Sequence, residues 1–563
     1  MKGLLYHVTT FMLICLNFLK SSQSFHSGAD VVYASIHKNE SNEWIIENTF
    51  NNDRIAAAKY TVGLEKIGWD LLAVKTNKNF PDDLQAEAAG RLEGYLTRER
   101  IWNHWRNLNL KTWEGKNMEE SSREFFKLQE EYILELYNSN PQDPINANAY
   151  YLLRQLNGLR DSYNFYVKDE MKIDDIEFHT ITSFGDLFDI KNYNPNNRPD
   201  FFNLSLEELE LYTTRNNHCS ALFKLKEDLS DLFFGHNSWF EYSAMTRIFK
   251  EYSFNFNHPS IKSRHILFSS YPGNLGSNDD FYITSQDLAV IETTNTLYDD
   301  GLFDLITPRC LLTWQRAMIA NRMSSTSKEW VGNFSKRNSG TYNNMFMALD
   351  MKKIDLENGI IGNEAMFIIE QIPGTTDIND VTEYLKYGYW PSFNAVFSRK
   401  ISKLSKIDEM IEKKPSMRDI IDYNTAARAI IFRRDHSKAN SKESFQQLIR
   451  YNDYLNDPAS KGIPTLSISA RGDLKNYCGG AYDAKMSSVK NAKGKNKVIS
   501  IVAGPSLGNN LPEFNWSNSE ICKDDPKYGL PEQPKFDWFE YRNEFYDESI
   551  YQFDNPELMK FLE

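Results

Sequence analysis

Apolar residues recur every three or four positions over long parts of the first third of the chain. Phe125, Leu128, Tyr132 and Leu136 illustrate this spacing. Because such a period places the apolar side chains on one face of a helix, it predicts amphipathic helices. The stretches with this pattern are residues 82–108, 122–137 and 146–167. Shorter apolar runs predict strands at residues 31–33, 44–46 and 68–74.

From residue 219 onward the pattern changes to short apolar runs separated by turns. Residues 219–223 and 232–234 are two such runs, close enough along the chain to pair as a hairpin. Mixed sheets covered by helices are the natural packing for this mixture, so the expected class is α+β. Further strands are predicted at residues 281–283 and 288–294, and further helices at residues 310–323 and 438–455.

Composition narrows the class of protein. The chain has 563 residues, of which 41% are hydrophobic, enough for a large packed core. Its formal net charge of −13, and the lack of a basic stripe with interleaved aromatics, argue against a nucleic-acid partner. Repulsion from anionic lipid surfaces weakens as carboxylates protonate, so an acidic compartment suits the chain. The lysine-rich residues 490–497 are expected to form a solvated loop.

The N-terminus has the features of a secretory signal. Lys2 gives a positive start, residues 11–16 form a short apolar centre interrupted at Asn17, and small residues precede a cut before Phe25. We therefore expect residues 1–24 to be a signal peptide, rather than a membrane anchor, and the protein to be secreted or lysosomal. No other apolar run is long enough for a transmembrane helix. Four sequons predict glycosylation at Asn39, Asn203, Asn333 and Asn515.

Four cysteines remain once Cys15 leaves with the predicted signal: Cys219, Cys310, Cys478 and Cys522. In an oxidising route they could form two disulfides. If Cys219 stays free, at most one forms, and the pair we favour is Cys478–Cys522, with Cys310 a buried thiol. Spacing does not by itself fix the pairing.

Cys219 stands where a polar stretch runs directly into the first strand of the predicted hairpin. His236 and Trp239 follow the second strand, so the hairpin would return both beside the thiol. A thiol and an imidazole placed together are typical of nucleophilic catalysis. Taken alone, however, a buried Cys is more often a core residue, and the same holds for a lone Trp.

A series of short motifs runs through the chain in a fixed order, at residues 218–222, 235–239, 269–273, 280–283, 292–294, 338–344, 370–374, 431–435, 450–454 and 468–474. In this order they resemble the phospholipase B-like (lamina ancestor) family over nearly the whole mature chain. Any one motif would be a weak signal. The series is specific.

The resemblance implies an N-terminal nucleophile hydrolase with an αββα sandwich and an added, largely helical N-terminal segment. It also implies cleavage immediately before Cys219, giving fragments 25–218 and 219–563. The cut can be argued chemically, since sulfur can attack the His218 carbonyl, form a thioester by an N-to-S acyl shift and release it to water. The α-amine freed on Cys219 would then serve as the base for its own thiol.

The resemblance assigns further residues to the site. His236 lies beside the thiolate and Trp239 shapes the pocket. Thr294 supplies a pocket hydroxyl, and the side-chain amide of Asn394 helps hold an oxyanion. Without the family, a turn histidine, a core ring, a strand residue and a turn asparagine would be the ordinary interpretations of these four.

Arg428 matches the family arginine that faces the nucleophile, where it would hold the thiolate or a substrate oxygen. The chain departs from the family here, with Ala427 where proline is frequent. Arg433 and Arg434 are equally cationic, and surface pairing with Asp435 is the alternative for all three arginines.

These inferences predict a hydrolase that removes acyl chains from phospholipids through a Cys thioester. An N-acyl amide hydrolase of the same fold, and a non-catalytic lipid-binding glycoprotein, remain alternatives. No cofactor is expected, and neither a His-Glu-x-x-His nor a Cys-x-x-Cys motif occurs to predict a metal site. One Gly-x-Ser-x-Gly match occurs, at residues 504–508, but Asn509-Asn510-Leu511-Pro512 follows it instead of the helix that a serine lipase elbow requires. The oligomeric state is left open.

Overall fold

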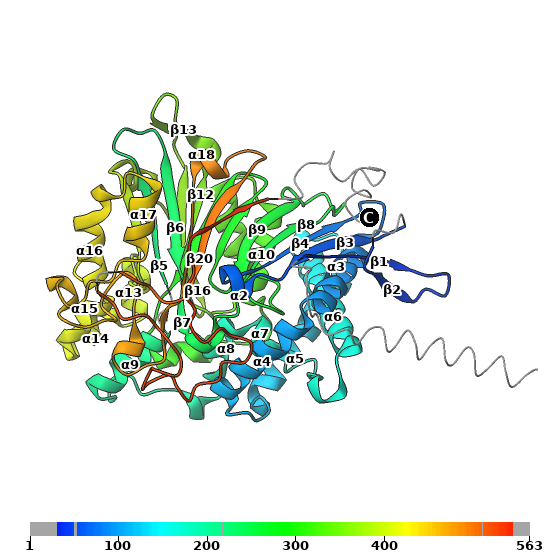
Figure 1. The fold of residues 1–563 in the computed structure, drawn as a ribbon, viewed down its shortest axis with the longest axis horizontal. Helices are drawn as coiled ribbons and strands as arrows, with labels where there is room; N and C mark the ends of the chain where they lie inside the picture. Colours follow the sequence, from blue (N-terminus) through cyan, green and yellow to red (C-terminus); the bar gives the residue numbers. More distant parts are fainter. Residues whose placement is uncertain (1–30, 50–52, 217–218, 509, 544–563) are drawn as a thin grey trace, which may run out of the picture.

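The computed structural model describes residues 31–49, 53–216, 219–508 and 510–543 (Figure 1). The predicted signal peptide and its cut lie outside the described residues, and so does His218. Within the described part, no helix is both long and apolar enough to cross a membrane.

A large mixed sheet has eleven strands in the order β16-β15-β12-β11-β10-β9-β8-β4-β3-β1-β2. β4 and β8 run parallel, whereas the other neighbours are antiparallel. Strands from before and after residue 219 therefore share one sheet. Its strands are β1 (Val31–Lys38), β2 (Trp44–Glu47), β3 (Ala56–Thr61), β4 (Asp70–Thr76), β8 (Ile248–Ser253), β9 (His265–Ser270), β10 (Phe281–Thr284), β11 (Leu288–Thr294), β12 (Asn344–Asp350), β15 (Met366–Ile372) and β16 (Thr375–Asp380).

A second, antiparallel sheet has six strands in the order β17-β5-β6-β19-β20-β21. The predicted hairpin is confirmed, because β5 and β6 pair with Ala221 opposite His236. The strands are β17 (Tyr389–Ser392), β5 (Ser220–Leu225), β6 (Leu232–Asn237), β19 (Asp483–Ser488), β20 (Val498–Ala503) and β21 (Phe539–Arg542). Two further pairs are β7 (Trp239–Glu241) with β18 (Gly479–Ala481), and β13 (Ile354–Asp355) with β14 (Ile360–Ile361).

The two sheets share one apolar core. Phe223 and Phe234 of the smaller sheet are buried in the same cluster as Phe281, Ile291 and Met347 of the larger one. The rings of Phe234 and Phe281 lie 6.1 Å apart. Strands buried on both faces explain why apolar runs such as 288–291 lack a strict alternation.

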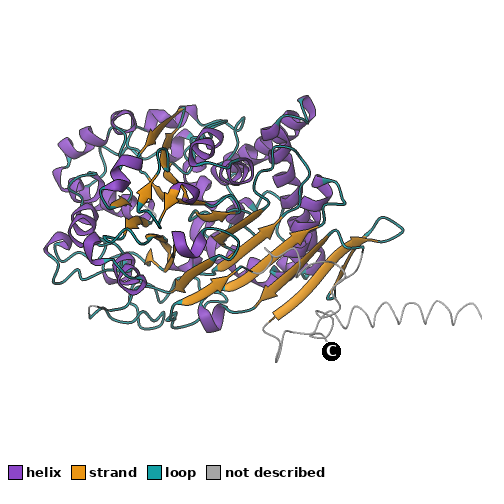
Figure 2. Ribbon diagram, turned by 90° about the horizontal axis from the view of Figure 1, so that it is seen from above, coloured by secondary structure: helices purple, strands orange, loops and turns teal. Residues whose placement is uncertain are grey.

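Helices cover the outer faces of both sheets, which confirms the α+β class (Figure 2). On the large sheet, Trp330 of α11 packs on Phe346 of β12. On the smaller sheet, α16 and α17 lie outside β5 and β6, where Phe445 meets Phe233 (Figure 1). The α-helices of the described residues are α2 (Leu64–Ile67), α3 (Asp82–Leu96), α4 (Arg98–Trp113), α5 (Glu120–Ser139), α6 (Pro144–Tyr166), α7 (His179–Thr182), α8 (Phe184–Lys191), α9 (Leu206–Asn216), α10 (Thr313–Met323), α11 (Ser327–Phe334), α12 (Thr382–Lys386), α13 (Arg399–Leu404), α14 (Ile407–Lys413), α15 (Arg418–Ile421), α16 (Ala427–Asp435), α17 (Lys442–Ile449) and α18 (Val489–Ala492).

Two local expectations need correction. The helix expected at 438–455 is shorter, since α17 covers only Lys442–Ile449. The lysine-rich run is not a simple solvated loop. Its first residues form α18, and Lys497 is fully buried with its ammonium 2.9 Å from Asp287. A buried ammonium needs such a partner, and composition alone does not reveal one.

The favoured disulfide is confirmed, since Cys478 and Cys522 are bonded. It connects the segment just before β18 to the loop that precedes β21. Cys219 and Cys310 are both free and buried. The thiol that the sequence singled out is thus available for chemistry.

Candidate active site around Cys219

Cys219 immediately precedes β5 and is only 1% exposed. Its backbone φ is +93°, a conformation that costs a residue with a side chain free energy. Burial and the nearby Glu292 carboxyl raise the pKa of its thiol well above the usual value. In this form of the chain the sulfur is therefore a neutral thiol held at a strained position.

His236 lies beside that thiol, as the hairpin predicted. One ring nitrogen of His236, the Cys219 sulfur and one Glu292 oxygen all lie within 4.8 Å of one another. Neither ring nitrogen has a well-formed hydrogen bond to a described residue, although the side chain is fully buried. Burial, together with the positive charge of Lys485, lowers the pKa of His236 well below its usual value. The imidazole is neutral and has unfilled hydrogen-bonding capacity next to the sulfur.

Glu292 is a functional candidate that the sequence reasoning missed. It lies on β11 of the other sheet, and its Oε1 is 3.9 Å from the Cys219 sulfur. Tyr342 donates a hydrogen bond of 3.0 Å to the same oxygen. Burial raises the pKa of Glu292 well above its usual range. The available signal was a single ionisable residue directly after the apolar run 288–291.

Cys219, His236 and Glu292 also make up the one group in the described part of the chain with the donor types and spacing to hold a metal ion. Thiolate, imidazole and carboxylate together suit a zinc-like ion. No sequence motif could have predicted this set, since its members come from the residue before β5, from β6 and from β11.

Arg428 reaches the nucleophile through its backbone. Its Nη1 donates to the Cys219 carbonyl at 2.9 Å and to Ser220 Oγ at 3.1 Å. The guanidinium lies 4.2 Å from the centre of the Trp239 ring, a cation–π contact. Burial lowers the pKa of Arg428 to about 9. The residue is thus near the site as expected, but it holds the Cys219 main chain rather than the sulfur.

The structure separates Arg428 from its two sequence alternatives. Arg433 is exposed and donates to the Asn424 carbonyl at 2.7 Å. Arg434 forms ion pairs with Asp435 and Asp457 at 2.5 and 2.8 Å. Neither contact involves the residues around Cys219.

Asn237 links Trp239 to the first residue of β5 through hydrogen bonds. Its Oδ1 accepts from the Ser220 backbone N–H at 2.9 Å and from the Trp239 indole at 2.8 Å. Its amide nitrogen donates to the Ile449 and Ile468 carbonyls. The first residues after Cys219 are therefore held on several sides.

Asn394 and Thr294 contact each other. Asn394 follows β17, has a φ of +64°, and donates its side-chain amide to the Thr294 carbonyl at 2.7 Å. The oxyanion role needs an N–H of this amide, and one of its two N–H groups is already hydrogen-bonded to Thr294. The Thr294 hydroxyl is buried without a hydrogen-bond partner among the described residues. It lines a pocket instead, in agreement with the predicted pocket hydroxyl.

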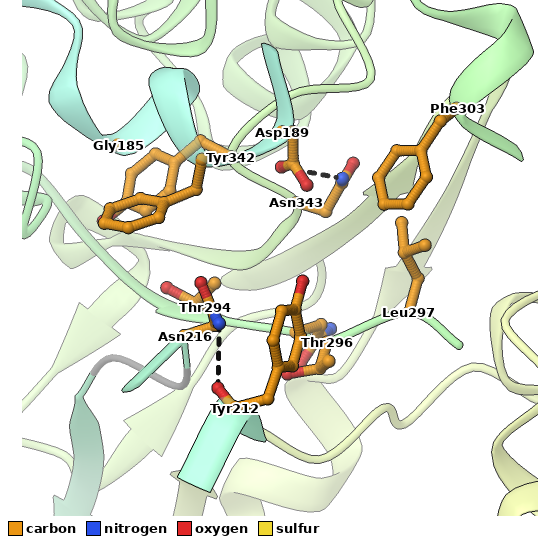
Figure 3. Close-up of a pocket in the computed structure, with 12 residues that line it drawn as sticks. Gly185, Asp189, Tyr212, Asn216, Thr294, Thr296, Leu297, Phe303, Tyr342 and Asn343 are labelled. Carbon is orange, nitrogen blue, oxygen red and sulfur yellow. Dashed lines mark hydrogen bonds between the residues drawn. The ribbon is translucent and has the colours of Figure 1, made fainter. Parts of the chain in front are cut away.

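Two small cavities lie in this part of the molecule, and Cys219 lines the first of them. The first, about 10 Å³ when measured at the centre of a water-sized sphere, is lined by Cys219, Trp239 and Asp279 among others. The second, about 30 Å³ on the same measure, contains Thr294 and is drawn in Figure 3. Their linings share Gly185, Phe188 and Tyr342. An open groove meets the second cavity at Phe188, Tyr212 and Asn216.

A buried charge network supports the wall of the first cavity. Asp279 accepts from Lys485 and from Arg247, each at 2.5 Å, and from Ser238 at 2.8 Å. Asp483 forms a second ion pair with Arg247 at 2.9 Å. The two cations hold the pKa of Asp279 well below its usual range. Sequence reasoning missed this network, since its members are far apart along the chain.

The predicted glycosylation sites differ in their surroundings. Asn203 is exposed, whereas Asn39 and Asn515 are partly exposed. Asn333 lies inside α11 and donates its amide to Ser324 at 3.0 Å. The structure thus favours Asn203 as the most accessible acceptor, and modification at all four remains a prediction.

Comparison with known proteins gives a consistent result. A family model described as Phospholipase B matches residues 56–541. Phospholipase B-like protein C of Dictyostelium discoideum is 34% identical, covering 93% of this chain and 93% of that protein. Phospholipase B of Crotalus adamanteus is 33% identical over 91% of this chain and 92% of its own length. Phospholipase B-like 1 of Bos taurus is 34% identical over 91% of this chain and 93% of its own.

Proposed function

The chain belongs to the phospholipase B family, and we propose that it is a cysteine hydrolase that removes acyl chains from phospholipids. The observation that carries the proposal is the convergence of the Cys219 thiol, His236 and Glu292 within 4.8 Å, with Cys219 lining a cavity. The two face-to-face sheets with helices on both outer faces agree with the αββα sandwich of N-terminal nucleophile hydrolases.

Maturation comes first in this proposal. The Cys219 sulfur attacks the carbonyl carbon of residue 218, and the acyl group moves from nitrogen to sulfur. The Cys219 α-amine is released in the same step. Water then hydrolyses the thioester, leaving a carboxylate on residue 218 and a free thiol on Cys219. The φ of +93° supports the cut here, since cleavage relieves the strain.

Arg428 and Asn237 keep the new N-terminus in place. A chain end is ordinarily poorly ordered unless something ties it down. The hydrogen bonds from Arg428 to the Cys219 carbonyl and from the Ser220 N–H to Asn237 supply that restraint. The α-amine therefore stays close to the thiol it must deprotonate.

Turnover uses the same atoms. The α-amine takes the thiol proton, the sulfur attacks the ester carbonyl, and the alcohol leaves with a proton from the α-ammonium. The resulting thioester is attacked by water with the amine as base, which releases the fatty acid and restores the thiol. His236 and Asn394 are the candidate donors to the developing oxyanion.

One experiment tests both stages. Purified protein is treated at acidic pH, and its chains are weighed by mass spectrometry before acyl release from phosphatidylcholine and from N-acyl amides is measured. We expect a fragment that begins with Cys219, and Cys219-dependent release from the phospholipid. Cys219→Ala should give neither. A chain that stays intact would contradict the maturation step.

Two alternatives have distinct outcomes. Cys219-dependent release from N-acyl amides alone would identify an amidase of the same fold. A cleaved protein that binds lipid but turns over neither substrate would be a lipid-binding glycoprotein whose nucleophile serves maturation.

A further inference from the structure

The second cavity has an unusual set of hydrogen-bonding groups. Figure 3 shows Asp189 and Asn343 on one side of it and Thr294, Asn216 and Tyr212 on the other. Asn295 also belongs to the lining. Among the described residues, Asn343 Oδ1, Asn295 Oδ1 and the Thr294 hydroxyl have no hydrogen-bond partner, although these residues are only 2%, 4% and 7% exposed.

The orientation of both amides is fixed by their nitrogen atoms. Asn343 Nδ2 donates to Asp189 at 3.2 Å and to the Gly340 carbonyl at 3.0 Å. Asn295 Nδ2 donates to Glu370 at 3.1 Å. Since an amide nitrogen can only donate, the atoms left over in both residues are acceptors. Buried acceptors without donors cost free energy, so this cavity is short of donors.

The cavity is also short of positive charge. Among the described residues no Lys, Arg or His forms an ion pair with Asp189. Burial raises the pKa of Asp189 to about 7, and the nearby Asp186 acts in the same direction. A bound cation would supply the missing counter-charge.

We propose that this cavity binds the primary ammonium group of a lipid headgroup of the ethanolamine type. An –NH₃⁺ group has three donors and no acceptor, which matches Asn343 Oδ1, Asn295 Oδ1 and the Thr294 hydroxyl, with Asp189 as counter-ion. The lipid part of this inference rests on the proposed function.

Donor number and size both favour the smaller headgroup. The space open to the centre of a water-sized sphere is only about 30 Å³. A trimethylammonium group is bulkier than a primary ammonium and has no N–H donor for the three acceptors. The single carboxylate favours a monovalent cation over a divalent one, since carboxylates from several residues normally hold Ca²⁺.

The position agrees with a headgroup subsite. The cavity shares Gly185, Phe188 and Tyr342 with the cavity beside Cys219. It also meets the open groove at Phe188, Tyr212 and Asn216. A headgroup bound here would leave the ester end of the same lipid close to the nucleophile.

Binding of soluble headgroups tests the subsite without relying on catalysis. Acid-treated full-length protein is titrated calorimetrically with glycerophosphoethanolamine and with glycerophosphocholine. We expect the ethanolamine compound to bind at least tenfold more tightly. Asp189→Asn should lose that preference, whereas the exposed control Asp524→Asn should keep it. If Asp189→Asn does not fold, Thr294→Val serves as the second test. It removes one acceptor, keeps the shape of the side chain and should weaken ethanolamine binding several-fold.

Equal affinity for the two compounds, no binding of the ethanolamine compound, or an unchanged preference in Asp189→Asn or in a folded Thr294→Val would overturn the subsite. So would binding of K⁺ or Ca²⁺ that Asp189→Asn abolishes, which would identify a metal-ion site. Wild type that shows the preference but hydrolyses no lipid would contradict the proposed function and keep the subsite. Cys219-dependent lipid hydrolysis without any headgroup preference would support the proposed function and contradict the subsite.

Discussion

The Cys219 sulfur lies 3.9 Å from Glu292 Oε1, although Cys219 leads into β5 of the smaller sheet and Glu292 lies on β11 of the larger one. Burial raises the pKa of both groups, and each would raise that of the other further when ionised. In the uncleaved chain both groups therefore favour their neutral forms. Glu292 therefore affects the pKa of the thiol through the charge of its carboxylate.

Replacing Glu292 by Gln tests this relationship. Gln keeps a polar group of the same shape but cannot become an anion, so we expect acid-triggered cleavage within about threefold of wild type. Under alkaline conditions the thiol of Glu292→Gln should ionise at a lower pH than that of wild type, since no carboxylate opposes it. The measurement is the pH dependence of alkylation by iodoacetamide, in a Cys310→Ser background so that Cys219 alone reports. Superimposable profiles would show that Glu292 does not influence the thiol.

Arg428 gives a second prediction. Arg428→Ala removes the hydrogen bond to the Cys219 carbonyl and the contact with Trp239. We expect a loss of roughly 2–4 kcal/mol in transition-state stabilisation, seen as a fall of about 30- to 1,000-fold in kcat/KM for acyl release. Arg428→Lys should recover only part of it, because Lys cannot reproduce the planar fork.

Arg433→Ala is the matched control, because Arg433 lies on the same helix but is exposed. It should behave like wild type. Normal turnover of Arg428→Ala, with a fall in Arg433→Ala, would transfer the role to the neighbouring arginine.

A third prediction concerns the charge network next to the site. Asp279→Asn leaves Lys485 and Arg247 with one buried carboxylate, Asp483, between them. An uncompensated buried charge is strongly destabilising, so we expect a loss of roughly 3–5 kcal/mol in the free energy of unfolding. Urea unfolding followed by tryptophan fluorescence measures it, with the exposed Asp524→Asn as control. A variant as stable as the control would mean that water replaces the lost partner.

Much of the fold around Cys219 could be predicted because it is local. The β5–β6 hairpin follows from two short apolar runs with a short connection, and it fixes where His236 lies. Glu292 and Arg428 reach the same place from 73 and 209 positions away. Periodicity gives no information about such distant contacts. Only the family resemblance indicated Arg428, and the one signal for Glu292 was its position as an ionisable residue directly after the apolar run 288–291.

The errors have a related cause. Lys497 was expected in solvent because lysine-rich runs usually are solvated, yet its partner Asp287 lies in a turn between β10 and β11. A pairing between segments so far apart is decided by tertiary structure, which composition cannot encode. The long helix predicted at 82–108 is also divided at Thr97, into α3 and α4.

Glu370 gives the last prediction, a dependence of stability on pH. Glu370 is fully buried and accepts from the backbone N–H groups of Phe397 and Ser398 at 2.9 and 2.6 Å. Burial nevertheless raises its pKa from 4.5 to about 7. A raised folded-state pKa means that its contribution to stability is fully present below 4.5 and is lost as pH rises through about 7. The shift corresponds to a loss of about 3 kcal/mol at neutral pH.

The contribution of Glu130 to stability depends on pH in the opposite direction. Arg160 and His179 hold the pKa of Glu130 at about 2 against the effect of burial. Its contribution is therefore lost only as pH falls from 4.5 through 2. The two groups together favour maximal stability near pH 4–5.

Urea unfolding at intervals from pH 4.5 to 7.5 measures the slope of the free energy of unfolding against pH in wild type and in Glu370→Gln. The variant should be less stable at every pH, because its amide nitrogen faces a backbone donor, but its slope should be flatter. An identical slope in both proteins would mean that Glu370 does not titrate in this range.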